Sequence, residues 1–386
     1  MTLLRCIGSM LLLIYWFDGT AATAQTDSTA VADSLFSLQL ERSLQPEPSS
    51  IQQQSAPRSF LSVNPDISAI GDFRSAYTSI GTRPIDMYLN ELEIQIASVV
   101  DPYARAEFIV SFGRDPESRE LGIELEVATL TSLSLPYQLQ LTLGKFKPVI
   151  GKVNVLHPHY FSFVDFPKVI NNYFESEGMF MEGASASWLL PNPYDFYQEL
   201  TVEVGRAGSE PNAAVAPGED GQLLYVGHLK NFLDLGPNST LEFGLSGVHG
   251  PNRFGSSTLL AGVDLTFKWK PLRHNVYRSF SWQSEVLYAN MRLSDAEVIR
   301  TYGGFSFIEY QLERRWFVGA RYDYSGFPDD PARKEQAASL LLRFQPTEFQ
   351  ILALQYQYSK RNYDRNMSQV VLRVIFGIGS HAAHQY

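Results

Sequence analysis

The pattern that most constrains the fold is an alternation of apolar and polar residues along the chain. Between positions 120 and 128, aliphatic residues occupy every second position, and small or charged residues occupy the others. The aliphatic set is Leu121, Ile123, Leu125 and Val127, and the intervening set is Gly122, Glu124, Glu126 and Ala128. Stretches 91–96 and 263–270 alternate in the same way. A period of two residues predicts β-strands with one apolar and one polar face.

The connections between the predicted strands alternate in length. Short connections rich in Pro, Asn, Asp and Gly lie at 100–102, 135–136, 191–194, 234–238, 271–275, 314–315 and 345–347. Longer, more polar ones lie at 114–119, 151–177, 206–221, 249–257, 293–303, 326–336 and 360–366. Short turns at one end and long loops at the other are typical of membrane barrels, whose apolar faces meet lipid. We therefore predict an all-β fold at residues 61–386. It is a transmembrane antiparallel up-and-down β-barrel of about 16 strands, within a range of roughly 14 to 18.

The N-terminal residues predict export. Arg5 precedes an apolar run at 7–17, and small residues precede Gln25, which fits a signal peptide at 1–24. Residues 25–60 are rich in Ser, Gln, Pro and Ala and predict a disordered or partly helical periplasmic segment. Cys6 is the only cysteine and lies in the signal peptide, so the mature chain offers no thiol nucleophile or ligand.

The composition agrees with a membrane location. Aromatic residues make up 13% of the chain and recur near predicted strand ends, as an interfacial girdle requires. After the N-terminus, no apolar run reaches the roughly 18 residues of a transmembrane helix. We expect the protein to lie in the outer membrane of a Gram-negative-type bacterium. The expected partners are outer-membrane lipid, small hydrophilic solutes and the barrel assembly machinery. A homotrimer is a further option, and we expect no nucleic-acid partner.

Short motifs along the barrel region resemble those of known proteins. The stretch Gly144-Lys145-Phe146-Lys147-Pro148 resembles a strand end of the phosphate-selective porin-like superfamily. Further motifs lie at 64–68, 100–105, 156–159 and 379–384. Together they resemble a family of uncharacterised bacterial outer-membrane porin-like proteins, some of which carry the label zinc-regulated TonB-dependent outer membrane receptor. The resemblance implies a porin-like barrel and does not identify the cargo.

Strand parity assigns charged residues to the lumen. The predicted pore-lining residues are Glu91, Glu93, Arg105, Glu107, Glu124, Glu126, Glu199, Glu203, Asp264, Lys268, Glu285 and Arg321. Acids outnumber bases here, and the net formal charge of the chain is -10. Acidic rings favour cations, whereas a phosphate pathway needs closely spaced Arg or Lys. We therefore predict a weakly cation-preferring or unselective pore; a lining of mutually paired charges that filters nothing is the alternative.

The longest predicted connection, at 151–177, is too apolar to extend into solvent. It follows the fifth predicted strand, and the loop at this position in sixteen-stranded porins folds inward and narrows the channel. The predicted constriction residues are Lys147, Lys152, His157, His159, Asp165 and Lys168. His157 and His159 flank Pro158 and are weak metal candidates, with Asp165 or Glu175 within reach if the loop folds back. A rigid loop corner is the alternative reading, and no cofactor is expected.

The residues thus predict an outer-membrane porin-like channel for passive diffusion of small hydrophilic solutes or ions. Two alternatives remain open: an outer-membrane receptor or transport component for a metal or small nutrient, and a closed structural barrel whose loops fill the lumen. We assign no catalytic residue, because no short motif joins a nucleophile, a base and an orienting group.

Overall fold

The computed structural model describes residues 65–81, 84–114, 121–174, 178–194, 196–208, 214–218, 221–273, 276–294 and 296–379. The predicted signal peptide (1–24) and periplasmic segment (25–60) lie outside the described residues, as do 61–64 and 380–386. Among the residues that the structure describes, no helix has the length and apolar character needed to cross a membrane.

Sixteen β-strands account for most of the described chain. In order, they are β1 (Asp66–Thr78), β2 (Ile85–Asp101), β3 (Ala104–Arg114), β4 (Leu121–Ser132), β5 (Leu139–Phe146), β6 (Met181–Leu189), β7 (Tyr197–Ala207), β8 (Leu224–Gly236), β9 (Ser239–Pro251), β10 (Ser257–Trp269), β11 (Phe280–Arg292), β12 (Val298–Glu313), β13 (Trp316–Phe327), β14 (Asp330–Thr347), β15 (Gln350–Arg361) and β16 (Met367–Gly379). Within the described ranges, three short helices accompany them: η1 (Pro136–Gln138), η2 (Pro158–Tyr160) and α3 (Lys168–Tyr173).

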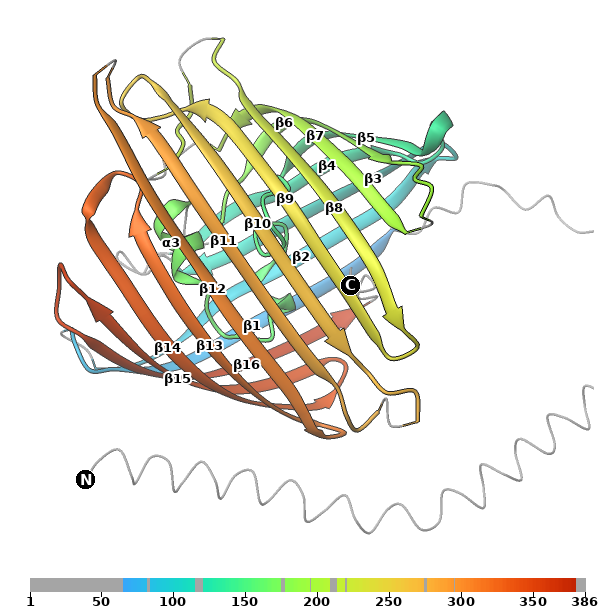
Figure 1. Cartoon of the computed structure of the whole chain (residues 1–386). Helices are drawn as coiled ribbons and strands as arrows, with labels where there is room; N and C mark the ends of the chain where they lie inside the picture. The colour runs from blue at the N-terminus through green and yellow to red at the C-terminus, as the bar shows by residue number, and fades with distance from the viewer. Residues whose placement is uncertain are drawn as a thin grey trace, which may run out of the picture. The chain divides into compact units, whose positions relative to one another are not determined.

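The strands form one closed ring (Figure 1). Each strand pairs antiparallel with its neighbours in sequence, and β1 pairs with β16 to close the barrel. The closing pair runs from Ser68 opposite Gly379 to Thr78 opposite Gln369. Every strand therefore has a partner on both sides, which limits the unpaired backbone groups that hydrocarbon would penalise; the pairing is shortest between β4 and β5, from Ala128 opposite Lys145 to Thr131 opposite Thr142. The predicted all-β barrel of about 16 strands is therefore confirmed.

Several connections have the lengths that the sequence predicts, but the predicted short connection at 271–275 is longer, because β10 ends at Trp269 and β11 begins at Phe280. The β2–β3, β12–β13 and β14–β15 connections span two residues each, and they define the turn end of the barrel. The predicted long connection at 326–336 is wrong, because β13 ends at Phe327 and β14 begins at Asp330. Polar residues of this stretch continue the ladder, with Gly326 opposite Lys334. Backbone pairing does not need apolar side chains. The stretch of alternating apolar residues is therefore shorter than the paired strands β13 and β14.

The two faces of the sheet differ as the alternation predicts. Outward side chains are apolar and exposed, such as Ile123 (70% exposed) and Leu340 (63%). Inward carboxylates are buried inside the ring, such as Glu203 and Glu285, each 1% exposed. The strands therefore present an apolar outer wall and a polar inner wall.

Strand β4 departs from the predicted alternation at one point. Val127, predicted to share the outer face with Leu125, is only 9% exposed. The pairing with β3 explains this: Ile109 lies opposite Val127 and Val110 lies opposite Leu125, so Glu126 is an extra residue without an opposite partner. Such a β-bulge shifts the parity of the strand and re-aims nearby side chains.

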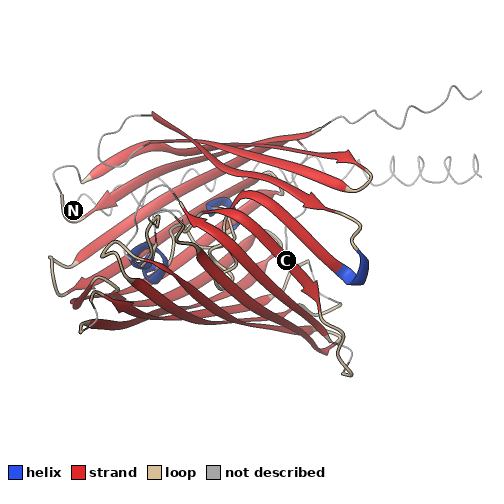
Figure 2. Cartoon of the chain, turned by 90° about the horizontal axis from the view of Figure 1, so that it is seen from above, coloured by secondary structure: helices blue, strands red, loops and turns tan. Residues whose placement is uncertain are grey.

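The inside of the ring is occupied by the chain between β5 and β6. We call residues 147–180 the inward loop; 175–177 are not described. The loop contains η2 and α3, and α3 contacts the inner side of β12, β13 and β14. Figure 2 shows these short helices between the strands. The predicted inward fold of this connection is thus observed.

Candidate functional site

Two glycines direct the chain from β5 into the lumen. Gly144 has a φ of +133° and Gly151 a φ of +61°, values that other residues rarely adopt. A Cβ atom at Gly144 would overlap the carbonyl oxygen of Ala128 on β4, and one at Gly151 would overlap the carboxylate of Glu285 on β11. The Gly-Lys-Phe motif therefore marks a close backbone approach at which the chain leaves the wall.

An apolar core holds the inward loop inside the barrel. Ile150, Val153, Val169 and Ile170 are each 0% exposed. They belong to one cluster of buried apolar residues with inward side chains of the wall, among them Leu260, Leu287 and Phe305. Burying each such aliphatic side chain contributes about 1.5–3 kcal/mol. Part of the inner wall is therefore apolar and shaped to receive the loop.

Acidic side chains of the wall accept hydrogen bonds from the start of the loop. Glu203 Oε2 accepts from the Val149 amide at 2.9 Å, and Glu285 Oε2 accepts from the Lys152 and Val153 amides at 3.3 Å. The Lys152 ammonium donates to Glu242 Oε1 at 2.8 Å. Irregular backbone inside a barrel needs such partners because it has no ladder of its own. These predicted pore-lining acids thus serve the loop directly.

Asp165 anchors the other part of the loop. Arg321 donates to its main-chain oxygen at 2.8 Å and to its Oδ1 at 3.0 Å, and Gln357 donates to its Oδ2 at 3.1 Å. Burial raises the pKa of Asp165, but the charges of Arg321 and Lys168 outweigh it and lower the pKa to about 2. The Lys168 amide also donates to Asp323 at 3.1 Å. Two predicted constriction residues therefore attach the loop to β13 and β15.

His157 contacts two strand carboxylates. Its Nδ1 lies 2.9 Å from Glu126 Oε2 on β4 and 3.1 Å from Glu93 Oε2 on β2. Burial and the charge of Lys147 lower the pKa of His157, but the close contacts with Glu126 and Glu93 outweigh both and raise it to about 9. His159 Nδ1 lies 3.4 Å from the same Glu93 oxygen. The wall, not the loop acid Asp165, supplies the carboxylates beside these histidines; Glu175 is outside the described residues.

The remaining predicted lining residues lie on the inner face without meeting at one point. Glu124 binds Lys145 at 3.4 Å, Gln95 donates to Glu107, and Tyr197 donates to Glu199 at 2.6 Å. Glu91 and Asp264 are buried, Lys268 lines the cavity described below, and Arg105 is exposed near the turn end.

Two acids of inward ion pairs, Asp72 and Glu309, were not predicted as lining residues. Asp72 on β1 binds Arg74 at 2.7 Å and Arg373 at 2.9 Å, and Arg373 also donates to the Phe163 carbonyl at 3.3 Å. Glu309 binds Arg343 at 2.8 Å. The alternation along β1 and β12 could have predicted both acids, because Asp72 and Glu309 lie on the same strand face as other inward residues.

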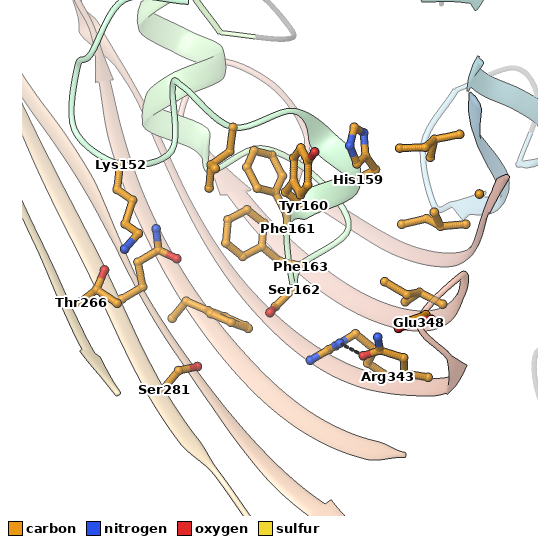
Figure 3. A pocket seen from close by; sticks show the side chains of 18 of the residues that line it. Lys152, His159, Tyr160, Phe161, Ser162, Phe163, Thr266, Ser281, Arg343 and Glu348 are labelled. Carbon is orange, nitrogen blue, oxygen red and sulfur yellow. Dashed lines mark hydrogen bonds between the residues drawn. The ribbon is translucent and has the colours of Figure 1, made fainter. Parts of the chain in front are cut away.

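Open space remains between the inward loop and the turn end. A cavity of about 320 Å³ is lined by Lys152, Lys268, Arg343 and Glu348 among other residues. In Figure 3, the aromatic side chains of Phe161 and Phe163 extend from the loop toward this cavity. A neighbouring cavity of about 410 Å³ shares Lys152 and Lys268 with the first. Basic groups outnumber acidic ones on the walls of both, so the charge of the lumen changes along its length.

Comparison with known proteins identifies the fold. No protein-family model matches the chain. An uncharacterised protein of Aquifex aeolicus (strain VF5) is 28% identical over 339 residues, which cover 77% of this chain and 70% of that protein. The anion-selective porin from Comamonas acidovorans aligns with a TM-score of 0.57 at 11% identity, covering 82% of this chain and all of that one. OmpT, an outer membrane protein of Vibrio cholerae, aligns in its trimer form with a TM-score of 0.51 at 11% identity, covering 81% and 99% of the two chains. The chain thus has the fold of outer-membrane porins.

Proposed function

We propose that this chain, which has the fold of the sixteen-stranded outer-membrane porins, is an outer-membrane channel for passive diffusion of small hydrophilic solutes or ions. One observation supports this most directly: a closed barrel with an apolar outer face has charged side chains along its inner face. Charged groups at membrane depth are costly unless they face water, solute or a partner. A polar lumen across an apolar wall is the arrangement that a water-filled pathway requires.

The inward loop would set the width of this pathway. It is attached to the wall through Glu203, Glu285 and Asp323, and through Arg321 at Asp165. Such attachments on several strands hold the loop at a defined position across the lumen. A narrow passage then admits only small solutes.

We propose weak or absent charge selectivity for the channel. The acids that favour cations are largely engaged: Glu242 with Lys152, Glu309 with Arg343, and Asp72 with Arg373. Basic residues prevail at the cavity walls near the turn end. Alternating signs along a lumen oppose one another, so no single sign dominates permeation.

We further propose a non-enzymatic role, with lipid and the assembly machinery as partners. A homotrimer is an option that the trimer form of the Vibrio cholerae protein favours by its shared fold. Chemical cross-linking in detergent, followed by electrophoresis without heating, tests the assembly state.

The test of the channel is planar-bilayer recording with the refolded chain at 25–386. We expect discrete conductance steps and a reversal potential close to zero under a KCl gradient. A strong anion or cation preference would contradict the proposed selectivity. Detergent without protein is the control for bilayer leakage, and heat-modifiable migration on gels verifies that the barrel has folded.

A closed structural barrel is the second candidate. The complete burial of Ile150, Val153, Val169 and Ile170 inside the ring favours it, because such packing occupies lumen space. A correctly folded barrel that gives no conductance steps, and no swelling of liposomes in small sugars, would support this candidate and overturn the channel. A receptor or transport component for a metal or small nutrient remains the further alternative.

A further inference from the structure

We propose that Glu93, Glu126 and His157 form a binding site for a divalent transition-metal cation between the barrel wall and the inward loop. The site goes beyond the channel function and does not depend on it. Its three ligands come from three separate segments: β2, the bulge of β4, and the loop just before η2.

The distances between the ligand atoms suit a metal ion. His157 Nδ1 lies 2.9 Å from Glu126 Oε2 and 3.1 Å from Glu93 Oε2, and the ligand atoms of the three residues lie within 4.8 Å of one another. Nitrogen and oxygen ligands bind zinc at about 2.1 Å in tetrahedral geometry, so two ligand atoms of one ion are about 3.4 Å apart, a few tenths of an ångström more than the two distances here. An ion can therefore enter between these groups with small side-chain movements.

The ligand atoms are buried and short of other partners. Glu126, Glu93 and His157 are 0%, 3% and 7% exposed. Among the described residues, neither Glu126 oxygen receives a hydrogen bond of normal geometry, and the same is true of Glu93 Oε2 and His157 Nδ1. Buried carboxylates without hydrogen bonds are costly. A cation bound between Glu93 and Glu126 would compensate the cost of burying both carboxylates.

The charge around the site also favours a divalent cation. Two carboxylates meet there, and the ammonium of Lys147, whose charge acts on both Glu126 and His157, offsets only one of the two negative charges. One imidazole nitrogen and two carboxylate oxygens suit zinc and the neighbouring first-row divalent ions, and the absence of sulfur ligands disfavours Cu(I). His159, whose Nδ1 lies 3.4 Å from Glu93 Oε2, is placed to add a fourth ligand.

Local structure explains how the site forms. The bulge at Glu126 inserts one residue into β4, and both Glu126 and Val127 end up buried on the lumen side. Bulges are frequent where a strand must re-aim a side chain at a functional site. Pro158 begins η2 directly after His157 and limits the backbone there. A bound ion would therefore tie the loop to β2 and β4.

The test is calorimetric titration of the folded 25–386 chain with zinc ions alone, in detergent and without chelators. We expect one saturable site in the wild type. Glu126→Gln and His157→Gln should weaken it at least about tenfold, the lower range of losses seen when a metal site is perturbed. His249→Ala is the matched control, because His249 is exposed on β9, and its isotherm should equal that of the wild type. X-ray absorption at the zinc edge should report nitrogen and oxygen neighbours.

Two results would overturn the site. One is a wild type that binds no zinc, which would mean that a protonated His157 alone bridges the two carboxylates. The other is an isotherm that Glu126→Gln and His157→Gln leave unchanged. Heat-modifiable migration verifies that each variant has folded; if Glu126→Gln fails to assemble, Glu93→Gln replaces it with the same expected loss. Zinc binding is measured without conductance, so a closed barrel would leave this result interpretable.

Discussion

Asp165 shows how one side chain fixes the position of the inward loop. It is half-buried and receives hydrogen bonds from β13 and β15, and the charges that act on it are those of Arg321, Lys168, Asp323 and Arg74. The basic groups lower the pKa of Asp165 to about 2. Because the folded pKa lies below the unfolded one, the carboxylate stabilises the attached loop above the unfolded pKa, and this stabilisation is lost as pH falls.

We predict that Asp165→Asn lowers stability by about 2 kcal/mol at neutral pH. The difference between wild type and variant should stay constant from pH 7 down to about 4 and shrink between about 4 and 2, as Asp165 is protonated. Urea unfolding in detergent at a series of pH values measures this difference. A difference that persists at pH 2 would mean that the carboxylate charge is not responsible.

A second prediction concerns Gly144. Its Cβ would overlap the Ala128 carbonyl, and its φ of +133° strains other residues, so Gly144→Ala should cost about 3 kcal/mol or more. Gly227→Ala is the matched control, because nothing lies within 4 Å of a Cβ at Gly227. Unfolding free energies of both variants give the comparison. Equal stabilities would contradict a close approach of β4 and β5 at this point.

Among the elements, the inward loop depends on interactions with distant strands. It begins at the β4–β5 region, where only four residue pairs connect the two strands. It then contacts β2 and β4 through His157, and β12, β13 and β14 through α3. Side chains of β7, β11, β13 and β15 accept hydrogen bonds from main-chain amides of the loop, so the wall determines its path.

Val169 on α3 tests whether this loop restricts the lumen. Val169→Asp would bury an unpaired charge, which costs several kcal/mol, and the loop should leave its position. We predict a larger single-channel conductance than in the wild type. Val169→Ala removes apolar contact without adding charge and should cost about 2 kcal/mol while keeping the wild-type conductance. An unchanged conductance in Val169→Asp would show that the loop is not the constriction.

At the scale of the whole molecule, the pairing of β1 with β16 closes the barrel. Eleven residue pairs join these strands, and the pair at the C-terminal end of β16 is Gly379 with Ser68. Phe376 faces outward at 46% exposure, three residues before the end of β16. The described part of the closing contact therefore extends to Gly379.

We predict that deletion of 380–386 leaves membrane assembly and heat-modifiable migration unimpaired, since the eleven described pairs of β1 with β16 all lie at or before Gly379. The amount of folded barrel in isolated outer membranes measures this. The comparison is Phe376→Ala in the full-length chain. It should reduce assembly if the barrel assembly machinery recognises this outward aromatic residue of the last strand. Loss of assembly on deletion of 380–386 would instead mean that the machinery recognises the terminal residues.

Local sequence determined the barrel architecture. Alternation with a period of two specified which side chains face lipid and which face the lumen, and turn residues separated the strands. Both signals arise from neighbouring residues, so they can be read without tertiary structure. Their limits were local as well: the bulge at Glu126 reversed the parity of Val127, and polar strand extensions at 326–336 resembled a loop.

Only the tertiary structure decided what the inward loop touches. His157 meets Glu93 and Glu126, and Asp165 meets Arg321, across long stretches of chain. No spacing in the sequence relates these residues, because their proximity depends on closure of the ring and on the path of the loop across it. Alternation assigns a side chain to the lumen, but the partners it finds there depend on which strands lie opposite one another.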